Sequence, residues 1–307
     1  MSISRSRFAA LLAAGAIAST FAACGSDDDS SSPSGSSGGT STPAAGTGSA
    51  NSGSTVAGVP DEIKSKGTLT VAADASYPPD EFIDKDGKTV IGMDADLAKA
   101  LGQKLGLQVN VVNASFDGII PGLASGKYDL GMSSFTDTKE REGTVDFVTY
   151  FSAGTSFYTK ADGGPAITDL ASLCGHKVAA EKGTTQQSDA EAQAKKCPSG
   201  QKLELSVFPD QNGANLALSS GRAEVGMADS PVAAYQVKQS GGQFKLVGTP
   251  YGTAPYGIAI PKGNGMAQPV LDALKALMSD GTYKKTLDTW GLADGAITDP
   301  VINGATS

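Results

Sequence analysis

The sequence predicts an α/β protein whose folded part consists of two similar lobes. From about residue 60 to about residue 303, short runs of valine, isoleucine and leucine alternate with segments whose apolar residues recur at helical spacing. Such alternation is typical of an α/β fold with a largely parallel sheet. The second observation is an internal echo, in which several short motifs recur in the same order later in the chain.

The alternation predicts the regular elements of the first half of the chain. Leu97, Ala98 and Leu101 fall on one face of a helix, because residues three and four positions apart are neighbours on a helix surface. We expect strands at residues 67–73, 108–112 and 128–132, and helices at residues 93–104 and 116–124.

The echo relates two stretches that begin at Leu123 and Leu218. The first reads LASGKYDLGMSS and the second reads LSSGRAEVGMAD, and the upstream strings VAAD (71–74) and VAAE (178–181) also correspond. In each copy a helix would end at Ser-Gly, where glycine suits a left-handed backbone, and a short strand would follow. Small α/β units can share such strings by chance, but several matches in one order favour two similar lobes.

Polar residues follow the predicted strands in both copies. In open α/β sheets, ligands bind outside the carboxyl ends of the strands. If both lobes present these ends to each other, the polar residues converge on one cleft. The candidates are Asp74, Tyr77, residues 133–136, residues 183–185 and Asp229.

The composition excludes several classes of function. The 307 residues include 24 Lys plus Arg and 32 Asp plus Glu, which gives a net charge of −8. A nucleic-acid-binding protein or a polybasic peripheral membrane protein would need a basic face. His176 is the single histidine, so a histidine-rich zinc site is excluded, and no metal site is expected. The sequence also lacks the phosphate-binding motif G-x-x-x-x-G-K-[ST], and it predicts no cofactor.

Residues 1–23 are typical of a bacterial lipoprotein signal peptide. Arg5 and Arg7 precede a mostly apolar run over residues 8–21, which is too short to span a bilayer as a helix. Small residues then precede Cys24, as in a lipobox, where the cysteine is lipidated; a plain secretory signal is the alternative. Residues 24–59, rich in Ser, Gly and Thr, are expected to form a flexible linker. We therefore expect the protein to be lipid-anchored at the extracytoplasmic face of the bacterial cell membrane.

Two further cysteines, Cys174 and Cys197, remain once Cys24 is assigned to the anchor. Two cysteines in an exported domain favour a disulfide bond. A metal site is the weaker alternative, because His176 is the one further ligand nearby.

Six motifs share the order and spacing of one protein family. They are ADASYPPDEFIDKDGK (73–88), SFDGIIPGLASGKYDLGMSSFTDTKERE (115–142), VDFVTYF (145–151), KGTTQQ (182–187), SGRAEVGMAD (220–229) and DGTYKKTLDTWG (280–291). On these motifs the chain, from residue 67 to about residue 302, resembles the extracellular solute-binding proteins of polar amino-acid ABC importers, the family 3 solute-binding lipoproteins. Each motif is weak alone, but together they are specific.

The resemblance implies a periplasmic-binding-protein-like clamshell. In this architecture a second α/β lobe is inserted into the first, and two hinge strands join them. We expect lobe 1 over residues 60–152 plus 258–303 and lobe 2 over residues 157–252, with the two crossings in the intervening segments. Ligand binding would close the lobes on each other.

The resemblance also implies an amino-acid site shared by both lobes. Arg141 would bind the ligand carboxylate with two parallel hydrogen bonds, and Thr136 with the backbone N–H of Thr185 would complete that site. Asp229 and Ser134 would bind the ammonium group. Without the resemblance, Arg141 would be part of a solvated charge run, and Asp229 would be a helix N-cap.

The resemblance also implies which residues surround the side chain of the ligand. Tyr77 and Phe116 match the family's aromatic walls, Asp74 matches an acidic position, and Ser133 belongs to the same candidate set. Alternatively, Phe116 is a core residue and Asp74 holds its own loop. Asp80 stands where the family usually has Phe. Either it makes the pocket more acidic, which would favour a cationic side chain, or it faces solvent.

These expectations describe a monomeric receptor that is not an enzyme. It would capture a polar amino acid, cationic if the pocket is acidic, and deliver it to an ABC permease. One alternative is an exported prephenate or arogenate dehydratase, which shares the fold and needs a general acid such as Asp74, Asp80 or Glu181. Another alternative is a sensor that docks a membrane receptor.

Overall fold

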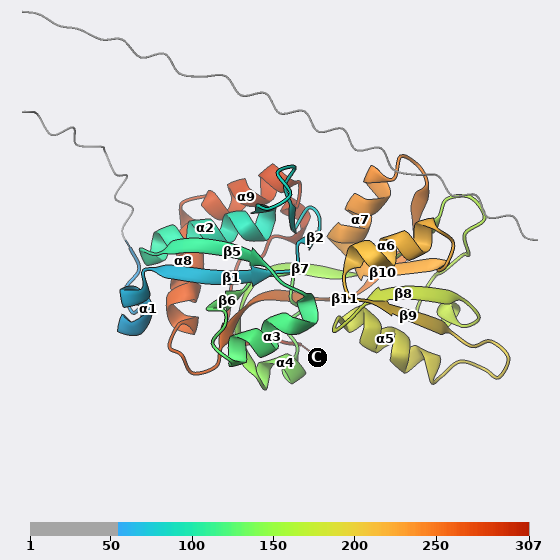
Figure 1. The fold of residues 1–307 in the computed structure, drawn as a ribbon, viewed down its shortest axis with the longest axis horizontal. Helices are drawn as coiled ribbons and strands as arrows, with labels where there is room; N and C mark the ends of the chain where they lie inside the picture. Colours follow the sequence, from blue (N-terminus) through green and yellow to red (C-terminus); the bar gives the residue numbers. More distant parts are fainter. Residues whose placement is uncertain (1–54, 307) are drawn as a thin grey trace, which may run out of the picture. The chain divides into compact units, whose positions relative to one another are not determined.

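The computed structural model describes residues 55–306 (Figure 1). The expected signal peptide, the lipidation of Cys24 and most of the expected linker lie outside the described residues. Within them, the core extends back to Val59, whose side chain is 3% exposed, and Val56 packs against the same cluster. The folded part therefore includes the two large apolar residues of the segment expected to be a linker.

The described residues form one large mixed sheet, one small sheet, and helices around them. The helices are α1 (Asp61–Lys66), α2 (Met93–Leu105), α3 (Phe116–Ala124), α4 (Lys139–Glu142), α5 (Thr185–Ala194), α6 (Gln211–Ser219), α7 (Ser230–Gln239), α8 (Ala267–Ser279) and α9 (Thr282–Trp290), with 3₁₀ turns η1 (Ala171–Leu173) and η2 (Ala293–Gly295). The large sheet contains β1 (Thr68–Ala73), β5 (Gln108–Asn113), β6 (Leu130–Gly131), β7 (Val145–Lys160), β8 (Lys177–Glu181), β9 (Glu204–Phe208), β10 (Val225–Asp229) and β11 (Phe244–Pro261). The small sheet contains β2 (Ser76–Tyr77), β3 (Glu81–Ile83) and β4 (Val90–Ile91).

Two long antiparallel strands, β7 and β11, join the two lobes. The large sheet has the order β5-β1-β6-β11-β7-β10-β8-β9, so β7 and β11 lie between two sets of strands (Figure 1). Strands β8 to β10 and helices α5 to α7 lie between β7 and β11 in the sequence. The second lobe is thus inserted into the first, which confirms the clamshell architecture. Both expected crossing segments fall within β7 and β11, while the lobe boundaries themselves stay a prediction.

Each lobe has a hydrophobic core of its own. In the first lobe, α2 packs its apolar face, including Leu97 and Leu101, against β1 and α8. In the second lobe, Val178 of β8 and Met227 of β10 lie in a separate buried cluster. A third buried cluster contains residues of both lobes, among them Phe135 of the first and Val232 of the second, so the two lobes also share part of their apolar burial.

The echo in the sequence corresponds to equivalent strand pairs in the two lobes. Strand β1 pairs parallel with β6, and β8 pairs parallel with β10. The helix before each inner strand is followed by a glycine with a left-handed backbone, Gly126 (φ 74°) and Gly221 (φ 77°). In the first lobe, Val71 pairs with Leu130 and Ala72 with Gly131. The corresponding residues of the second lobe pair in the same register, Val178 with Val225 and Ala179 with Gly226.

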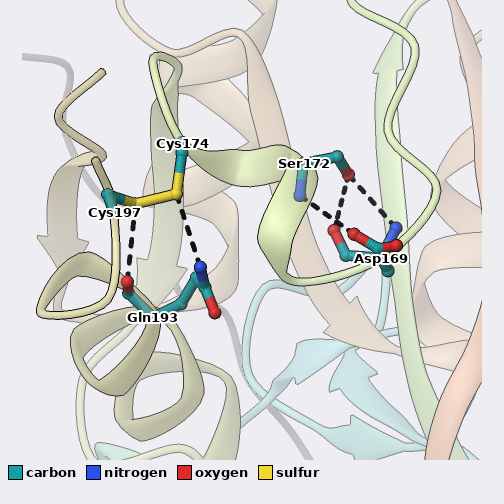
Figure 2. The surroundings of a disulfide bond; sticks show 5 residues. All are labelled: Asp169, Ser172, Cys174, Gln193 and Cys197. Atoms are coloured by element: carbon teal, nitrogen blue, oxygen red, sulfur yellow. Dashed lines mark hydrogen bonds between the residues drawn. A yellow bond between two sulfur atoms is a disulfide. The ribbon is translucent and has the colours of Figure 1, made fainter. Parts of the chain in front are cut away.

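A disulfide bond joins Cys174 and Cys197 in the second lobe, as Figure 2 shows, with their Cα atoms 5.5 Å apart. The prediction of a disulfide over a metal site is confirmed. The side chain of Gln193 donates a hydrogen bond to the sulfur of Cys174 at 3.4 Å. Asp169 and Ser172 hold the neighbouring turn, because the backbone N–H of Ser172 donates to the Asp169 carboxylate at 2.9 Å. The bond therefore fixes the C-terminal end of α5 to the η1 turn.

Across residues 55–306, no helix combines the length and the apolar composition that crossing a bilayer requires.

Candidate functional site

A cavity lies where the carboxyl ends of the strands of both lobes meet, and the space within it is about 350 Å³ when open solvent is included. Its walls come from segments after β1, β5, β6, β8, β9 and β10, as expected for an open α/β sheet. Seven of the nine predicted ligand-binding residues line it, together with Thr184 from the candidate loop 183–185 and four residues that the sequence did not indicate. The lining residues are Tyr77, Phe116, Ser134, Thr136, Arg141, Thr184, Thr185, Gln186, Gln211, Ala228, Asp229 and Val232.

Arg141 lies in α4 and directs its guanidinium group into this cavity. Nη1 donates to the backbone carbonyl of Thr136 at 2.8 Å, and Nη2 donates to the carbonyl of Gly183 at 3.0 Å. Both acceptors are neutral, and none of the ion pairs among the described residues involves Arg141. Its neighbour Lys139 instead pairs with Glu142 at 3.0 Å, as the charge-run interpretation would require. Arg141 thus makes no direct ion pair among the described residues and keeps further N–H donors for an anion.

Two aromatic rings pack against the guanidinium group of Arg141. The Cζ atom of Arg141 lies 5.3 Å from the ring centre of Phe116 and 5.5 Å from that of Phe135. The two rings stack on each other, with centres 4.5 Å apart. Burial lowers the pKa of Arg141, and the nearby carboxylate of Asp229 opposes this shift. Phe116 is therefore both a core residue and a wall of the cavity.

The N-terminus of α5 also lies at the cavity. Thr184 is the N-cap, and its hydroxyl accepts a hydrogen bond from the backbone N–H of Gln187 at 3.2 Å. Thr185 and Gln186 are the first helical residues, and both line the cavity. The first N–H groups of a helix have no partner within the helix and attract anions. Together with Arg141, they form a positive wall.

Asp229 provides a negative group in the same cavity. It precedes α7 as the N-cap residue, but its side chain makes no capping hydrogen bond. Instead, Oδ1 accepts from Nε2 of Gln186 at 2.6 Å, and Oδ2 accepts from the hydroxyl of Tyr256 at 2.7 Å. Burial raises the pKa of Asp229 to about 6, although these two hydrogen bonds and the charge of Arg141 favour the carboxylate. The side chain is thus directed at the cavity rather than at the helix.

Two of the predicted residues, Asp74 and Ser133, lie behind the cavity wall. The Asp74 carboxylate accepts from the hydroxyl of Ser76 at 2.6 Å and from the backbone N–H of Phe116 at 3.0 Å. The backbone N–H of Asp74 donates to the Ser133 hydroxyl at 2.8 Å. In turn, this hydroxyl donates to Glu81 at 3.0 Å. These contacts are those of the alternative interpretation, in which Asp74 holds its own loop.

Asp80 is fully buried, so of the two alternatives the one in which it faces solvent is wrong. It accepts a hydrogen bond from the hydroxyl of Ser134 at 3.0 Å. Asp94 accepts from the backbone N–H of the same serine, also at 3.0 Å, and Ser134 adopts a left-handed backbone (φ 51°). Burial and the neighbouring carboxyl of Asp94 raise the pKa of Asp80 well above its ordinary value. The side chain therefore supports the cavity wall from behind.

Sequence reasoning missed Gln186 and Gln211, which both line the cavity. Gln186 lies within the quoted motif KGTTQQ, so the motif contained the signal. Gln211 is the first residue of α6 and follows β9, whose carboxyl end the strand-end rule would have indicated. Its amide nitrogen donates to the hydroxyl of Tyr158 at 2.9 Å.

Polar contacts join the two lobes across the cleft, in addition to the buried apolar cluster that contains residues of both. They are the hydrogen bond from Arg141 to Gly183, a 3.1 Å hydrogen bond from the backbone N–H of Gln211 to the hydroxyl of Ser76, and a 2.8 Å ion pair between Lys182 and Asp117. The lobes are therefore in contact on both sides of the cavity.

Comparisons with known proteins agree with this geometry. The chain is 32% identical over 248 residues to "Arginine-binding protein ArgT" of Corynebacterium glutamicum, a match that covers 80% of this chain and 81% of that protein. It is 32% identical over 213 residues to "ABC transporter glutamine-binding protein GlnH" of Bacillus subtilis, and this match covers 67% of this chain and 74% of that protein. The solved structure "An ancestral arginine-binding protein bound to arginine" matches with a TM-score of 0.69 at 38% identity. This match covers 73% of this chain and 98% of that one.

The family comparison gives the same answer over most of the folded part. The profile of the bacterial extracellular solute-binding proteins, family 3, matches residues 69–293. This range contains every residue that lines the cavity. The chain belongs to the family 3 bacterial extracellular solute-binding proteins.

Proposed function

We propose that the protein binds a free polar amino acid outside the cytoplasmic membrane and delivers it to the permease subunits of an ABC transporter. The observation that carries this proposal is the pair of opposite charges in one cavity. Arg141 and Asp229 each interact with neutral partners, yet each is near enough to shift the pKa of the other. An α-amino acid carries a carboxylate and an ammonium group on one carbon, and it would complement both.

The two charges come from different lobes, which couples binding to closure. Arg141 and Thr136 belong to the first lobe, and Thr185 and Asp229 belong to the second. A ligand held by both lobes would favour the closed conformation by its differential affinity for that state. The closed shape is the signal that a permease can recognise.

The names of relatives support an amino-acid ligand without choosing one side chain. Relatives are named for arginine, cystine, histidine and glutamine. We infer a monomer tethered by a lipid on Cys24, which lies outside the described residues.

A second candidate function is catalysis, and one observation favours it. Burial and Asp74 raise the pKa of Glu181 to about 10, so this carboxyl is protonated at neutral pH and has the form of a general acid. A structural neighbour is described as an ancestral amino-acid-binding protein and "a precursor of cyclohexadienyl dehydratase". Incubation with arogenate and prephenate tests this directly, and we expect no turnover, because Arg141 and Asp229 hold an intact amino-acid head group.

Thermal melting against the twenty amino acids tests the binding proposal. A ligand at about 1,000 times its dissociation constant adds about 4 kcal/mol, which raises the melting temperature by roughly ten degrees in a chain of this size. We expect a shift with one chemical class of amino acid. The protein should first be unfolded and refolded to remove any bound ligand.

The variant Arg141→Ala should abolish this shift, because it removes the carboxylate partner and leaves Asp229 uncompensated, at a cost of roughly 3–5 kcal/mol. Lys139→Ala, in the same helix but paired on the surface with Glu142, is the matched control and should retain the shift. Full binding by Arg141→Ala, or no shift with any amino acid, would contradict the proposal.

A further inference from the structure

Residues 301–305, here called the 301–305 segment, lie against the start of β7 and beyond the range that the family profile matches. The backbone N–H of Thr149 donates to the carbonyl of Val301 at 2.9 Å, and the hydroxyl of Thr149 accepts from the backbone N–H of Val301 at 2.9 Å. The backbone N–H of Asn303 donates to the carbonyl of Phe147 at 2.9 Å. The segment thus adds a short partner on the side of β7 that β11 does not occupy.

Asn303 fixes the direction in which this segment leaves β7. Its backbone is left-handed (φ 56°), a conformation that asparagine tolerates better than most residues with a side chain. Its side-chain oxygen accepts from the backbone N–H of Phe147 at 2.8 Å, and its side-chain nitrogen donates to the carboxylate of Asp146 at 3.1 Å. The side chain of Asn303 therefore holds the segment to β7 and orients the two residues that follow.

The next two backbone N–H groups donate to the carboxyl groups at the two ends of α4. The N–H of Gly304 donates to Asp137 at 2.7 Å, and the N–H of Ala305 donates to Glu142 at 3.1 Å. Asp137 precedes the N-cap of α4, and Glu142 is its last residue. In Figure 1 the C-terminal end of the ribbon, marked C, lies beside α4. One segment therefore holds both ends of one helix.

Helix α4 is held mainly at its ends. It is four residues long, none of its residues is buried, and a helix this short is not stable by itself. The hydroxyl of its N-cap Thr138 accepts from the backbone N–H of Arg141 at 3.2 Å, and Lys262 donates to the carbonyl of Glu142. Arg141 extends from this helix to the wall of the ligand cavity. The position of its guanidinium group thus depends on contacts at the ends of α4.

The two carboxyl groups depend on the donors that the segment supplies. Burial raises the pKa of Asp137 to about 6, the charge of Glu142 adds to this shift, and the N–H of Gly304 favours the carboxylate. One oxygen of Asp137 is buried without a hydrogen-bond partner in the described part of the chain. Like charges near each other repel. Without the two N–H groups, Asp137 and Glu142 would separate, and α4 would move with them.

We propose that the 301–305 segment positions Arg141 for the ligand carboxylate by holding Asp137 and Glu142 at the two ends of α4. This inference rests on the proposed function and adds positioning residues that lie outside the site. Neither the segment nor these two acids line the cavity, so they act through the arginine. A fixed guanidinium group can meet a carboxylate with two parallel hydrogen bonds, which require precise geometry.

The variant Asn303→Gly tests the attachment of the segment to β7. Glycine adopts the left-handed backbone readily, but it removes both side-chain contacts. The probes are the twenty free L-amino acids, and titration calorimetry is carried out with the one that most raises the melting temperature. We expect its dissociation constant to rise about tenfold, because a misplaced guanidinium group loses the geometry of its hydrogen bonds.

Two substitutions of Asp137 separate the hydrogen bond from the charge. Asp137→Ala removes the acceptor for the N–H of Gly304 and should lower the affinity about tenfold. Asp137→Asn keeps an oxygen that can accept from this N–H, and it should retain the affinity of the unmodified protein. Lys104→Gln is the matched control, because it breaks a 2.7 Å ion pair with Asp280 in the same lobe and should lower stability without lowering affinity. Thermal melting of each variant checks that it is folded.

A double-mutant cycle with Arg141→Lys distinguishes positioning of the arginine from a general loosening of the first lobe. Lysine keeps the positive charge but lacks the planar fork that forms two parallel hydrogen bonds. If the segment acts through Arg141, adding Asn303→Gly to Arg141→Lys should change the affinity by less than about twofold. A general loosening would lower the affinity by the same factor in both backgrounds.

The outcomes separate this inference from the proposed function. Unchanged affinity in Asn303→Gly or Asp137→Ala, or the same loss in both backgrounds of the cycle, would overturn the inference and leave the amino-acid receptor intact. A loss in Asp137→Asn equal to that in Asp137→Ala would also overturn it, because the charge rather than the bond to the segment would then matter. No binding of any of the twenty amino acids by the unmodified protein would overturn both.

Discussion

The charged residues of the cavity are oriented by neutral partners. Arg141 donates to two backbone carbonyls, and Asp229 accepts from Gln186 and Tyr256. These bonds fix the position of each charge without neutralising it. A ligand therefore meets preorganised groups, and little of the binding free energy is spent on ordering side chains.

Gly226 shows how closely the second lobe is packed behind the cavity. A Cβ atom at this position would lie well inside the van der Waals contact distance of the Tyr158 ring. This ring cannot move away easily, because it is fully buried and its hydroxyl bonds to Asn215 at 2.5 Å and to Gln211 at 2.9 Å. We expect Gly226→Ala to lower the free energy of unfolding by about 1–3 kcal/mol, measured by urea denaturation.

The control for this prediction is Gly213→Ala. Gly213 lies within α6, where an added Cβ would make contacts of 3.3 Å with Phe208 and alanine has the higher helix propensity. The two changes are chemically identical, so their difference reports the local packing. Equal stabilities of the two variants would show that the Tyr158 ring moves freely.

At the scale of elements, helix α5 is fixed at both ends for different reasons. Its first turn forms part of the cavity, and its last turn is followed by Cys197, which is bonded to Cys174. The two cysteines are 23 positions apart, so the chain-entropy model gives the bond about 3.5 kcal/mol. We expect the double variant Cys174→Ser/Cys197→Ser to lose about this much unfolding free energy in urea denaturation.

Ligand binding by the same double variant should change less than about twofold, because the disulfide lies at the opposite end of α5 from the cavity. Calorimetry below the melting temperature measures this. A large loss of affinity would show that the bond positions the N-terminus of α5 rather than only stabilising the second lobe.

Local sequence patterns predicted the bounds of some helices and strands and not of others. Helix α3 has the predicted bounds, because its apolar spacing and Ser-Gly end are local signals. The predicted strand at residues 128–132 shortens to Leu130–Gly131, since strand length depends on the partner strands. Gln211 was missed because no strand was predicted at residues 204–208, whose carboxyl end it follows. Asp80 was undecided because burial is a tertiary property.

At the scale of the whole molecule, the echo predicts two lobes but not how the chain connects them. Two equal α/β units could also follow each other along the chain. The insertion follows from β7 and β11, which pair along most of their length and enclose the second lobe in the sequence. Only the family resemblance indicated this. The residues of the cavity were predictable where strands end in polar residues, because that rule is common to open α/β sheets.

The buried carboxyl groups predict an unusual dependence of stability on pH. Burial raises the pKa values of Asp94, Asp137 and Asp229 to about 6. A raised pKa means that the folded state binds protons more tightly than the unfolded state. The stabilisation is complete below about pH 4 and is lost as the pH rises through about 6. A difference of one in pKa between the folded and unfolded states corresponds to about 1.4 kcal/mol.

We therefore expect the urea midpoint of the ligand-free protein to fall as the pH rises from about 4 to about 7. In Asp94→Asn, an amide oxygen can still accept from Ser134 and Tyr150, and the fall should be smaller. Lys104 lowers the pKa of Asp280 to about 2, so the ionised carboxyl of Asp280 stabilises the folded state. This stabilisation is lost only as the pH falls below about 4. A midpoint that is constant or rises over this range would contradict the burial argument.

Both carboxyl oxygens of Glu181 are buried without a hydrogen-bond partner among the described residues, which has a consequence for how this receptor can evolve. Because the carboxyl makes no hydrogen bond that the fold requires, its replacement should not weaken folding and should even strengthen it. A glutamate codon becomes a glutamine codon by one nucleotide change. The residue at this position is thus one mutational step from glutamine, and a lineage can change it in either direction without first acquiring a stabilising mutation elsewhere.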